Sequence, residues 1–193
     1  MAVTTLDERT ALVLIDLQRG IAGMPTQPHP AADVIARSAE LAAAFRARGL
    51  PVVLVNVSFA PDGSDAPTGR TEVARPGGAP AEGWDRIVDE VGAQPSDIRV
   101  TKRNWGAFHG TDLDLQLRRR GVTQIVLTGI ATSIGVESTA RAAYEHGYNV
   151  ALATDAMSDR STASHEHSVA EIFPRLGETA TTAEILDVLA KTH

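Results

Sequence analysis

The sequence contains no cysteine. This absence excludes disulfide bonds, thiolate metal sites and thiol nucleophiles, although it identifies no redox compartment. No apolar run approaches the roughly 20 residues that a membrane-spanning helix needs. The mostly polar segment 1–9 carries Asp7 and Glu8 and does not resemble a secretory signal. We therefore expect a cytoplasmic protein with no membrane partner.

Positive charge is also scarce, because 18 Lys and Arg residues face 24 Asp and Glu residues, for a formal net charge of -6. The densest basic cluster, residues 118–120, ends a predicted helix, where cations complement the helix dipole. A local site for a phosphate or an acidic substrate is the alternative for that cluster. We expect no nucleic-acid partner. The segment after the first predicted strand lacks the glycine-rich nucleotide fingerprint, which argues against a dinucleotide cofactor.

The composition is typical of one globular domain. Hydrophobic residues make up 43% and charged residues 22% of a 193-residue chain, which is long enough to bury a substantial core. The sequence has no internal repeat, no linker and no low-complexity tail. We expect a single domain over residues 1–193, with a core from about 9 to 190.

Apolar runs alternate with helical patterns, which predicts an α/β fold with helices on both faces of a mostly parallel sheet. We expect strands at 11–15, 52–57, 98–101, 124–128, 149–154 and 178–180. We expect helices from Pro30 to Gly49, at 84–91, from Thr111 to Arg120, at 134–146, at 164–173 and after the capping-box pair Thr181 and Glu184.

The segment 58–83 breaks this alternation. It holds Pro61, Pro67, Pro76 and Pro80 among several glycines, so regular structure is not expected there. A loop of this length in a compact domain is usually a functional lid, an interface arm or a flexible excursion.

Polar residues follow several predicted strands. In an open α/β sheet, ligands bind beyond the carboxyl ends of the strands, near the point where the strand order reverses. Asp16 follows the first strand, Lys102 ends the third, and the turn after the fourth opens a helix near Gly135. The pattern therefore predicts a carboxylate, an ammonium group and a helix N-terminus around one pocket.

Four segments carry a resemblance to a known family. LIDLQ at 14–18, TKRNWGAFHGTDL at 101–113 and TGIATSIGVESTA at 128–140 resemble, in order, three signatures of the isochorismatase-like hydrolase superfamily. TDA at 154–156, with His167 after it, is similar to the strand and helix that follow in that superfamily. The resemblance covers nearly the whole chain and implies a three-layer, Rossmann-like fold with a six-stranded parallel sheet.

The resemblance also implies a catalytic triad of Asp, Lys and Cys, of which Asp16 and Lys102 match. The cysteine position is Gly135, which has no side chain to attack with, so covalent amidase chemistry is not expected. Ser133, Ser138 and Thr139 carry hydroxyls nearby, but each is displaced by at least two positions. Their expected roles are capping and packing.

Some isochorismatases also carry a small residue in place of the cysteine, and they cleave a vinyl ether without a protein nucleophile. The resemblance then implies Asp16 as general acid, with a pKa raised by an apolar site. Lys102 would position Asp16 and hold an anionic substrate group. Gly135 would let the ligand approach the helix N-terminus, whose N–H groups suit a carboxylate.

Four further motif residues are candidates for substrate binding: Gln18, Trp105, Phe108 and Ile134. His109 could line the pocket or cap a turn. His29, which stands between two prolines, does not reproduce the paired histidines of metal-binding relatives, so we expect neither a metal nor a cofactor. Two alternatives stay open, namely an amide hydrolase that uses activated water and an inactive small-molecule-binding homologue. We also expect a homo-oligomer, most simply a dimer.

Overall fold

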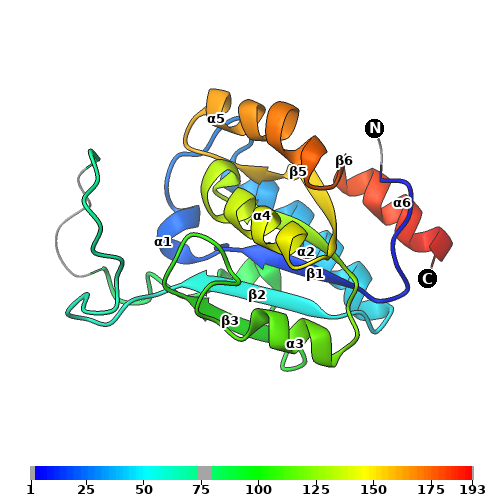
Figure 1. Cartoon of the computed structure of the whole chain (residues 1–193), viewed down its shortest axis with the longest axis horizontal. Coiled ribbons are helices and arrows are strands. Elements are labelled where there is room, and N and C mark those ends of the chain that lie inside the picture. Colours follow the sequence, from blue (N-terminus) through cyan, green and yellow to red (C-terminus); the bar gives the residue numbers. More distant parts are fainter. Residues whose placement is uncertain (1–2, 74–79, 193) are drawn as a thin grey trace.

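The computed structural model describes residues 3–73 and 80–192. Its centre is a six-stranded parallel sheet with the order β3-β2-β1-β4-β5-β6, which confirms the expected α/β class (Figure 1). The strands are β1 (Thr10–Ile15), β2 (Val52–Val57), β3 (Ile98–Lys102), β4 (Gln124–Ile130), β5 (Asn149–Ser158) and β6 (Glu178–Ala180). The order reverses between β1 and β4, so ligands are expected beyond the carboxyl ends of these two strands.

Helices cover both faces of the sheet. The α-helices are α1 (Arg19–Ala22), α2 (Ala31–Ala47), α3 (Leu113–Arg119), α4 (Glu137–Glu145), α5 (Thr162–His167) and α6 (Thr182–Thr192). Shorter turns of helix are η1 (Asp89–Val91), η2 (Thr132–Val136), η3 (Ser168–Ile172) and η4 (Phe173–Arg175). None of the helices in the described ranges has the length and apolar character to cross a membrane.

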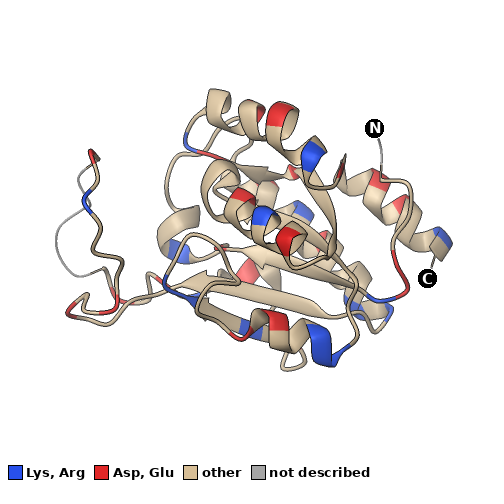
Figure 2. Ribbon diagram, viewed as in Figure 1, with Lys and Arg blue, Asp and Glu red and all other residues tan. Residues whose placement is uncertain are grey.

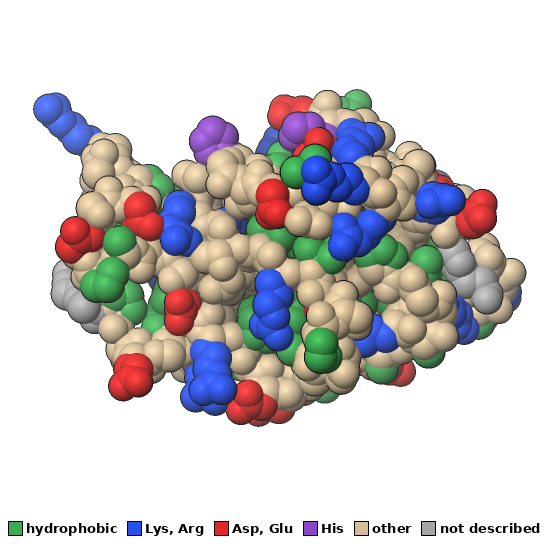
Figure 3. Space-filling view, turned by 90° about the horizontal axis from the view of Figure 1, so that it is seen from below, with side chains coloured by type: hydrophobic (Ala, Val, Ile, Leu, Met, Phe, Trp, Pro, Cys, Tyr) green, Lys and Arg blue, Asp and Glu red, His purple; other side chains and the backbone are tan. Residues whose placement is uncertain are grey.

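Two hydrophobic clusters join these layers. Alternate residues of β1 point to opposite faces, and both faces are buried, as expected for an inner strand of a parallel sheet. Val13 and Ile15 pack with α3 and α4, whereas Leu12 and Leu14 pack with α2 and α6. Most charged side chains lie on the helices and loops around this core (Figure 2). On the face drawn in Figure 3, acidic and basic groups are interspersed.

The helix predicted over 84–91 is wrong, because only η1 forms in this segment. The backbone of the segment bonds instead to the chain that follows β1. The amides of Arg19 and Gly20 donate to the carbonyls of Arg86 and Trp84, at 2.9 Å each, and Val88 donates to the Leu17 carbonyl at 3.0 Å. These bonds occupy groups that a helix would need for itself, and they draw Trp84 toward the end of β1.

Most other predicted boundaries are close to those observed. The helix expected from 134 begins as a π-helical turn at Thr132, and the helix expected over 164–173 begins at Thr162 and divides into α5, η3 and η4. The expected capping box forms, because the Thr181 amide donates to Glu184 Oε2 at 2.7 Å and the Glu184 amide donates to Thr181 Oγ1 at 3.3 Å.

The segment predicted to lack regular structure has no helix or strand over 58–73 and 80–83, within its described parts. Residues 74–79, which include Pro76, lie outside the described residues. The chain leaves the end of β2 and extends away from the sheet as an arm, drawn in cyan to green in Figure 1. Its role in a homo-oligomer stays a prediction.

Candidate active site

Asp16 lies directly beyond β1, at the reversal of strand order. Its φ of 54° is in the left-handed region, which Asp tolerates better than most side chains. Its amide donates to the Val55 carbonyl at 2.9 Å, so the backbone remains tied to β2 as it turns. The residue is only 4% exposed. The turn therefore holds a carboxylate in a largely dehydrated position.

Lys102, the last residue of β3, reaches this carboxylate. Its Nζ lies 2.8 Å from Asp16 Oδ2 and also donates to the carbonyls of Trp105 at 2.8 Å and Asn104 at 3.1 Å. An ammonium group has three N–H donors, and these three acceptors occupy all of them. Lys102 thus fits the expected role of positioning Asp16. Its expected second role, holding an anionic ligand, is not supported, because no donor is left for a ligand.

The environment sets the acidity of Asp16. Burial raises the pKa of its carboxyl to about 6, and the nearby Lys102 ammonium opposes this rise without cancelling it. Oδ1 is buried and has no hydrogen-bond partner among the described residues. Since Lys102 occupies Oδ2, the proton of the neutral acid belongs on Oδ1.

Gly135, in η2, faces the same carboxylate. A Cβ atom built on Gly135 would lie 3.2 Å from Asp16 Oδ2 and 2.8 Å from Ile15 Cγ2. Any side chain at this position would therefore press on Ile15 and sit beside the acid. The structure brings Asp16, Lys102 and Gly135 together, as the positions of the strand ends predict.

These three residues line a cavity of about 1080 Å³. Its walls are largely apolar and include the aromatic side chains of Phe59, Trp84 and Trp105. Both tryptophans of the chain are thus cavity residues. A concave apolar site with a few converging polar groups is typical of small-molecule binding.

Two of the four predicted binding residues, Trp105 and Ile134, line this cavity. Trp105 is 66% exposed, which places it at the rim. Trp84 forms another part of the wall and rests on Gly20, where an added Cβ would come within 1.7 Å of the indole ring. Glycine at position 20 is therefore what allows Trp84 to occupy this wall.

Gln18 and Phe108 lie outside the cavity lining, so their placement does not support the expected contact with substrate. The Gln18 amide group exchanges hydrogen bonds with the Val57 backbone, at 3.0 Å to its carbonyl and 2.8 Å from its amide, and so ties β1 to β2. The Phe108 ring stacks on His146 at 5.1 Å between centroids and packs in the core. His109, for which lining and capping were both open, is also outside the lining.

Two of the three nearby hydroxyls, those of Thr139 and Ser133, have structural partners. Thr139 Oγ1 donates to the Gly135 carbonyl at 2.6 Å and accepts from the Ala107 amide at 3.1 Å. Ser133 Oγ donates to Asp159 at 2.8 Å. The described residues contain no group of three or more His, Asp or Glu side chains arranged to hold a metal ion.

Sequence reasoning missed Phe59, Trp84 and Arg160, which also line the cavity. Phe59 belongs to the segment expected to be a lid or an arm, and its aromatic ring next to several prolines was the available signal. Trp84 was assigned to a helix, and Arg160 follows β5 with no motif to mark it.

The family follows from comparison with known proteins. A family model described as the isochorismatase domain matches residues 10–184. The chain belongs to the isochorismatase family. An isochorismatase family protein from Burkholderia thailandensis has a solved structure with a TM-score of 0.94 and 51% sequence identity, covering 98% of this chain and 100% of that one.

Two other family relatives show the range of the resemblance. The uncharacterized isochorismatase family protein YecD of Escherichia coli O157:H7 is 48% identical over 180 residues, 93% of this chain and 96% of YecD. The ureidoacrylate amidohydrolase RutB of Pseudomonas syringae pv. syringae is 34% identical over 170 residues, 76% of this chain and 69% of RutB. The family therefore includes hydrolases.

Proposed function

We propose that this isochorismatase family protein is a hydrolase that needs no protein nucleophile and uses Asp16 as its general acid. The proposed reaction is hydrolysis of a vinyl ether, in isochorismate or a related small anionic metabolite. One observation carries the proposal: a buried carboxyl with a pKa of about 6 and an unpartnered Oδ1 lines a largely apolar cavity. Such a group can be protonated near neutral pH and donate its proton.

The reaction can be written with these groups. Oδ1–H protonates the terminal carbon of the enol ether, and the C=C electron pair forms the new C–H bond. Water adds to the resulting oxocarbenium carbon, and the hemiketal collapses to a ketone and an alcohol. For isochorismate these products are pyruvate and a ring diol. The proton lost by water restores the acid, so no covalent enzyme intermediate is required.

Gly135 and Lys102 support this assignment. In the thiol members that the sequence resembles, a cysteine occupies the position of Gly135, and a side chain there would lie against Asp16 Oδ2. Glycine leaves that space free. Lys102 holds Oδ2 and so directs the acidic oxygen, Oδ1, away from the ion pair.

Amide hydrolysis by activated water is the second candidate, and the similarity to RutB favours it. In that reaction Asp16 would accept a proton from water, so its ionised form would be the active one. The two candidates therefore require opposite protonation states of one residue.

A substrate panel tests the proposal. The protein is incubated with isochorismate, related enol ethers and small amides, and pyruvate and ammonia are measured. We expect pyruvate from isochorismate, no ammonia, and no substrate-sized adduct on the protein by mass spectrometry after rapid quench. Ammonia release would favour the amidase alternative, an adduct would contradict the non-covalent route, and binding without either product would indicate an inactive homologue.

The pH profile separates the two hydrolytic routes. For vinyl ether hydrolysis the active form is protonated Asp16, so kcat/KM should be constant well below the pKa of about 6 and should fall tenfold per pH unit above it. Steady-state assays from pH 4.5 to 8.5 measure this decrease of kcat/KM. A rate that rises through the same range would instead identify Asp16 as a base.

A further inference from the structure

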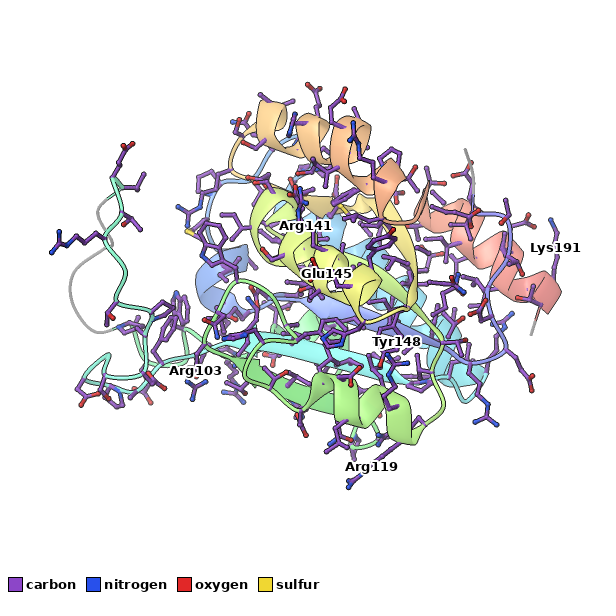
Figure 4. All side chains as sticks on the ribbon, viewed as in Figure 1. Arg103, Arg119, Arg141, Glu145, Tyr148 and Lys191 are labelled. Carbon is purple, nitrogen blue, oxygen red and sulfur yellow. The ribbon has the colours of Figure 1, made fainter. Side chains whose placement is uncertain are left out.

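Among the described residues, five charged side chains line the cavity, and four of them have a partner that limits their use by a ligand. Asp16 and Lys102 pair with each other. Arg103, labelled beside the arm in Figure 4, pairs with Asp65. Asp62 accepts a hydrogen bond from the Ser64 amide at 3.0 Å.

Arg160 is the exception. Among the described residues, no carboxylate lies within ion-pair distance of its guanidinium group. Its one polar contact beyond the backbone is between Nη2 and the Met24 sulfur, at 3.5 Å. A thioether is a weak acceptor and carries no charge. Arg160 therefore brings to the cavity a cation that forms no ion pair with any described residue.

The backbone of Arg160 is held in place by Asp159. One carboxylate oxygen of Asp159 accepts from the Arg160 amide at 2.7 Å, and the other accepts from the amide and hydroxyl of Ser133, at 2.7 and 2.8 Å. Asp159 also exchanges two backbone hydrogen bonds with Gln27, at 2.7 and 2.8 Å. These contacts join Arg160 to η2, the turn that carries Gly135. They also use both oxygens of Asp159, which forms no ion pair with the Arg160 guanidinium group.

We propose that Arg160 recognises a carboxylate on the ligand and makes the cavity selective for small carboxylates over neutral molecules of the same shape. Lys102 cannot do this, because its three N–H donors already have acceptors. A guanidinium group can bind a carboxylate through two parallel hydrogen bonds, and the aromatic walls can pack against an unsaturated ring. This inference deepens the proposed function and rests on it for the identity of the site.

Intrinsic fluorescence provides a direct test, because both tryptophans line the cavity. The probes are benzoate and benzamide, which share a planar ring but differ in charge. We expect wild-type protein to bind benzoate at least about tenfold more tightly than benzamide. Arg160→Ala should weaken benzoate binding about 10- to 100-fold, the range of a charged hydrogen bond, and leave benzamide binding unchanged. Arg160→Lys should fall between the two.

Arg141→Ala is the matched control, since Arg141 lies on α4, pairs with Glu137 and is outside the cavity lining (Figure 4). It should bind both probes as wild type does. The inference is overturned if wild type does not prefer benzoate, if millimolar benzoate gives no quenching, or if Arg160→Ala binds benzoate as tightly as wild type.

Failure of the inference can be told from failure of the proposed function, because fluorescence binding requires no turnover. If benzoate selectivity depends on Arg160 but the substrate panel yields no product, the recognition role holds and the hydrolase proposal fails. If isochorismate is hydrolysed and Arg160→Ala leaves KM unchanged, the recognition role fails and the role of Asp16 stands.

Discussion

Asp16→Asn is expected to lower kcat for the vinyl ether substrate by about 10²- to 10⁴-fold and to leave KM nearly unchanged. Asparagine has the shape of aspartic acid, and its amide oxygen can still accept the Lys102 hydrogen bond. Its NH₂ group cannot serve as an acid near neutral pH. The loss therefore falls on proton transfer, and the decrease of kcat/KM above pH 6 should disappear from the residual rate.

Steady-state kinetics from pH 4.5 to 8.5 check this expectation. Benzoate binding shows whether the cavity of the variant is intact. Asp187→Asn is the matched control, because Asp187 is an exposed residue of α6 that pairs with Lys191 and is outside the cavity lining. It should behave as wild type. A kcat for Asp16→Asn within about tenfold of wild type would contradict the general-acid role.

The sheet could be predicted from the sequence because each strand is a short apolar run. The bounds of β2 and β6 match the predicted ranges, and β1 differs by one residue. β5 was predicted to end at 154 but continues to Ser158. The register of its pairing with β4 shifts between Leu127 and Gly129, after which Met157 and Ser158 rejoin β4. The polar residues at 154 and 155 fall in this irregularity, so their polarity predicted an end that does not occur.

The grouping of the candidate catalytic residues could be predicted because strand ends meet at one edge of the sheet. Asp16, Lys102 and Gly135 each belong to a strand end or to the turn after one, so the topology alone brings them together. The wall of the cavity could not be predicted in the same way. Trp84 and Arg160 arrive from irregular segments whose position depends on long-range backbone bonds, and those leave no periodic signal.

Membership of a motif did not show which way a side chain points. Gln18 is two residues from Asp16, yet its side chain completes the pairing of β1 and β2. Phe108 is three residues from Trp105, yet it packs in the core while Trp105 lies at the rim. Residues close in sequence can thus serve stability and binding separately, and only the contacts distinguish them.

Lys102→Met is expected to destabilise the fold most strongly at high pH. Methionine keeps most of the length of the side chain but removes the cation, so ionised Asp16 would be buried without a partner. Breaking a buried pair in this way costs about 3–5 kcal/mol. At pH 5 the cost should be smaller, because Asp16 can be protonated and its neutral form tolerates burial.

The direction of this pH dependence of stability follows from the pKa of Asp16, which burial raises from 3.8 to about 6 in the folded wild type. A raised folded-state pKa means that stability is greatest below the unfolded value and is lost as pH rises through the folded value. Without Lys102 the folded pKa rises further, so the variant continues to lose stability above pH 6, where wild type no longer does. The gap between them should widen by up to about 1.4 kcal/mol per pH unit.

Urea unfolding of wild type and Lys102→Met at pH 5 and pH 8 measures this gap. The double variant Asp16→Asn/Lys102→Met is the control, because it has no ionisable group at either position and its stability relative to Asp16→Asn should not depend on pH in this range. Removal of the Lys102 cation raises the pKa of Asp16, so the decrease of kcat/KM in Lys102→Met should also shift to higher pH. If the stability gap were equal at both pH values and the decrease of kcat/KM stayed at the same pH, Lys102 would not set the acidity of Asp16.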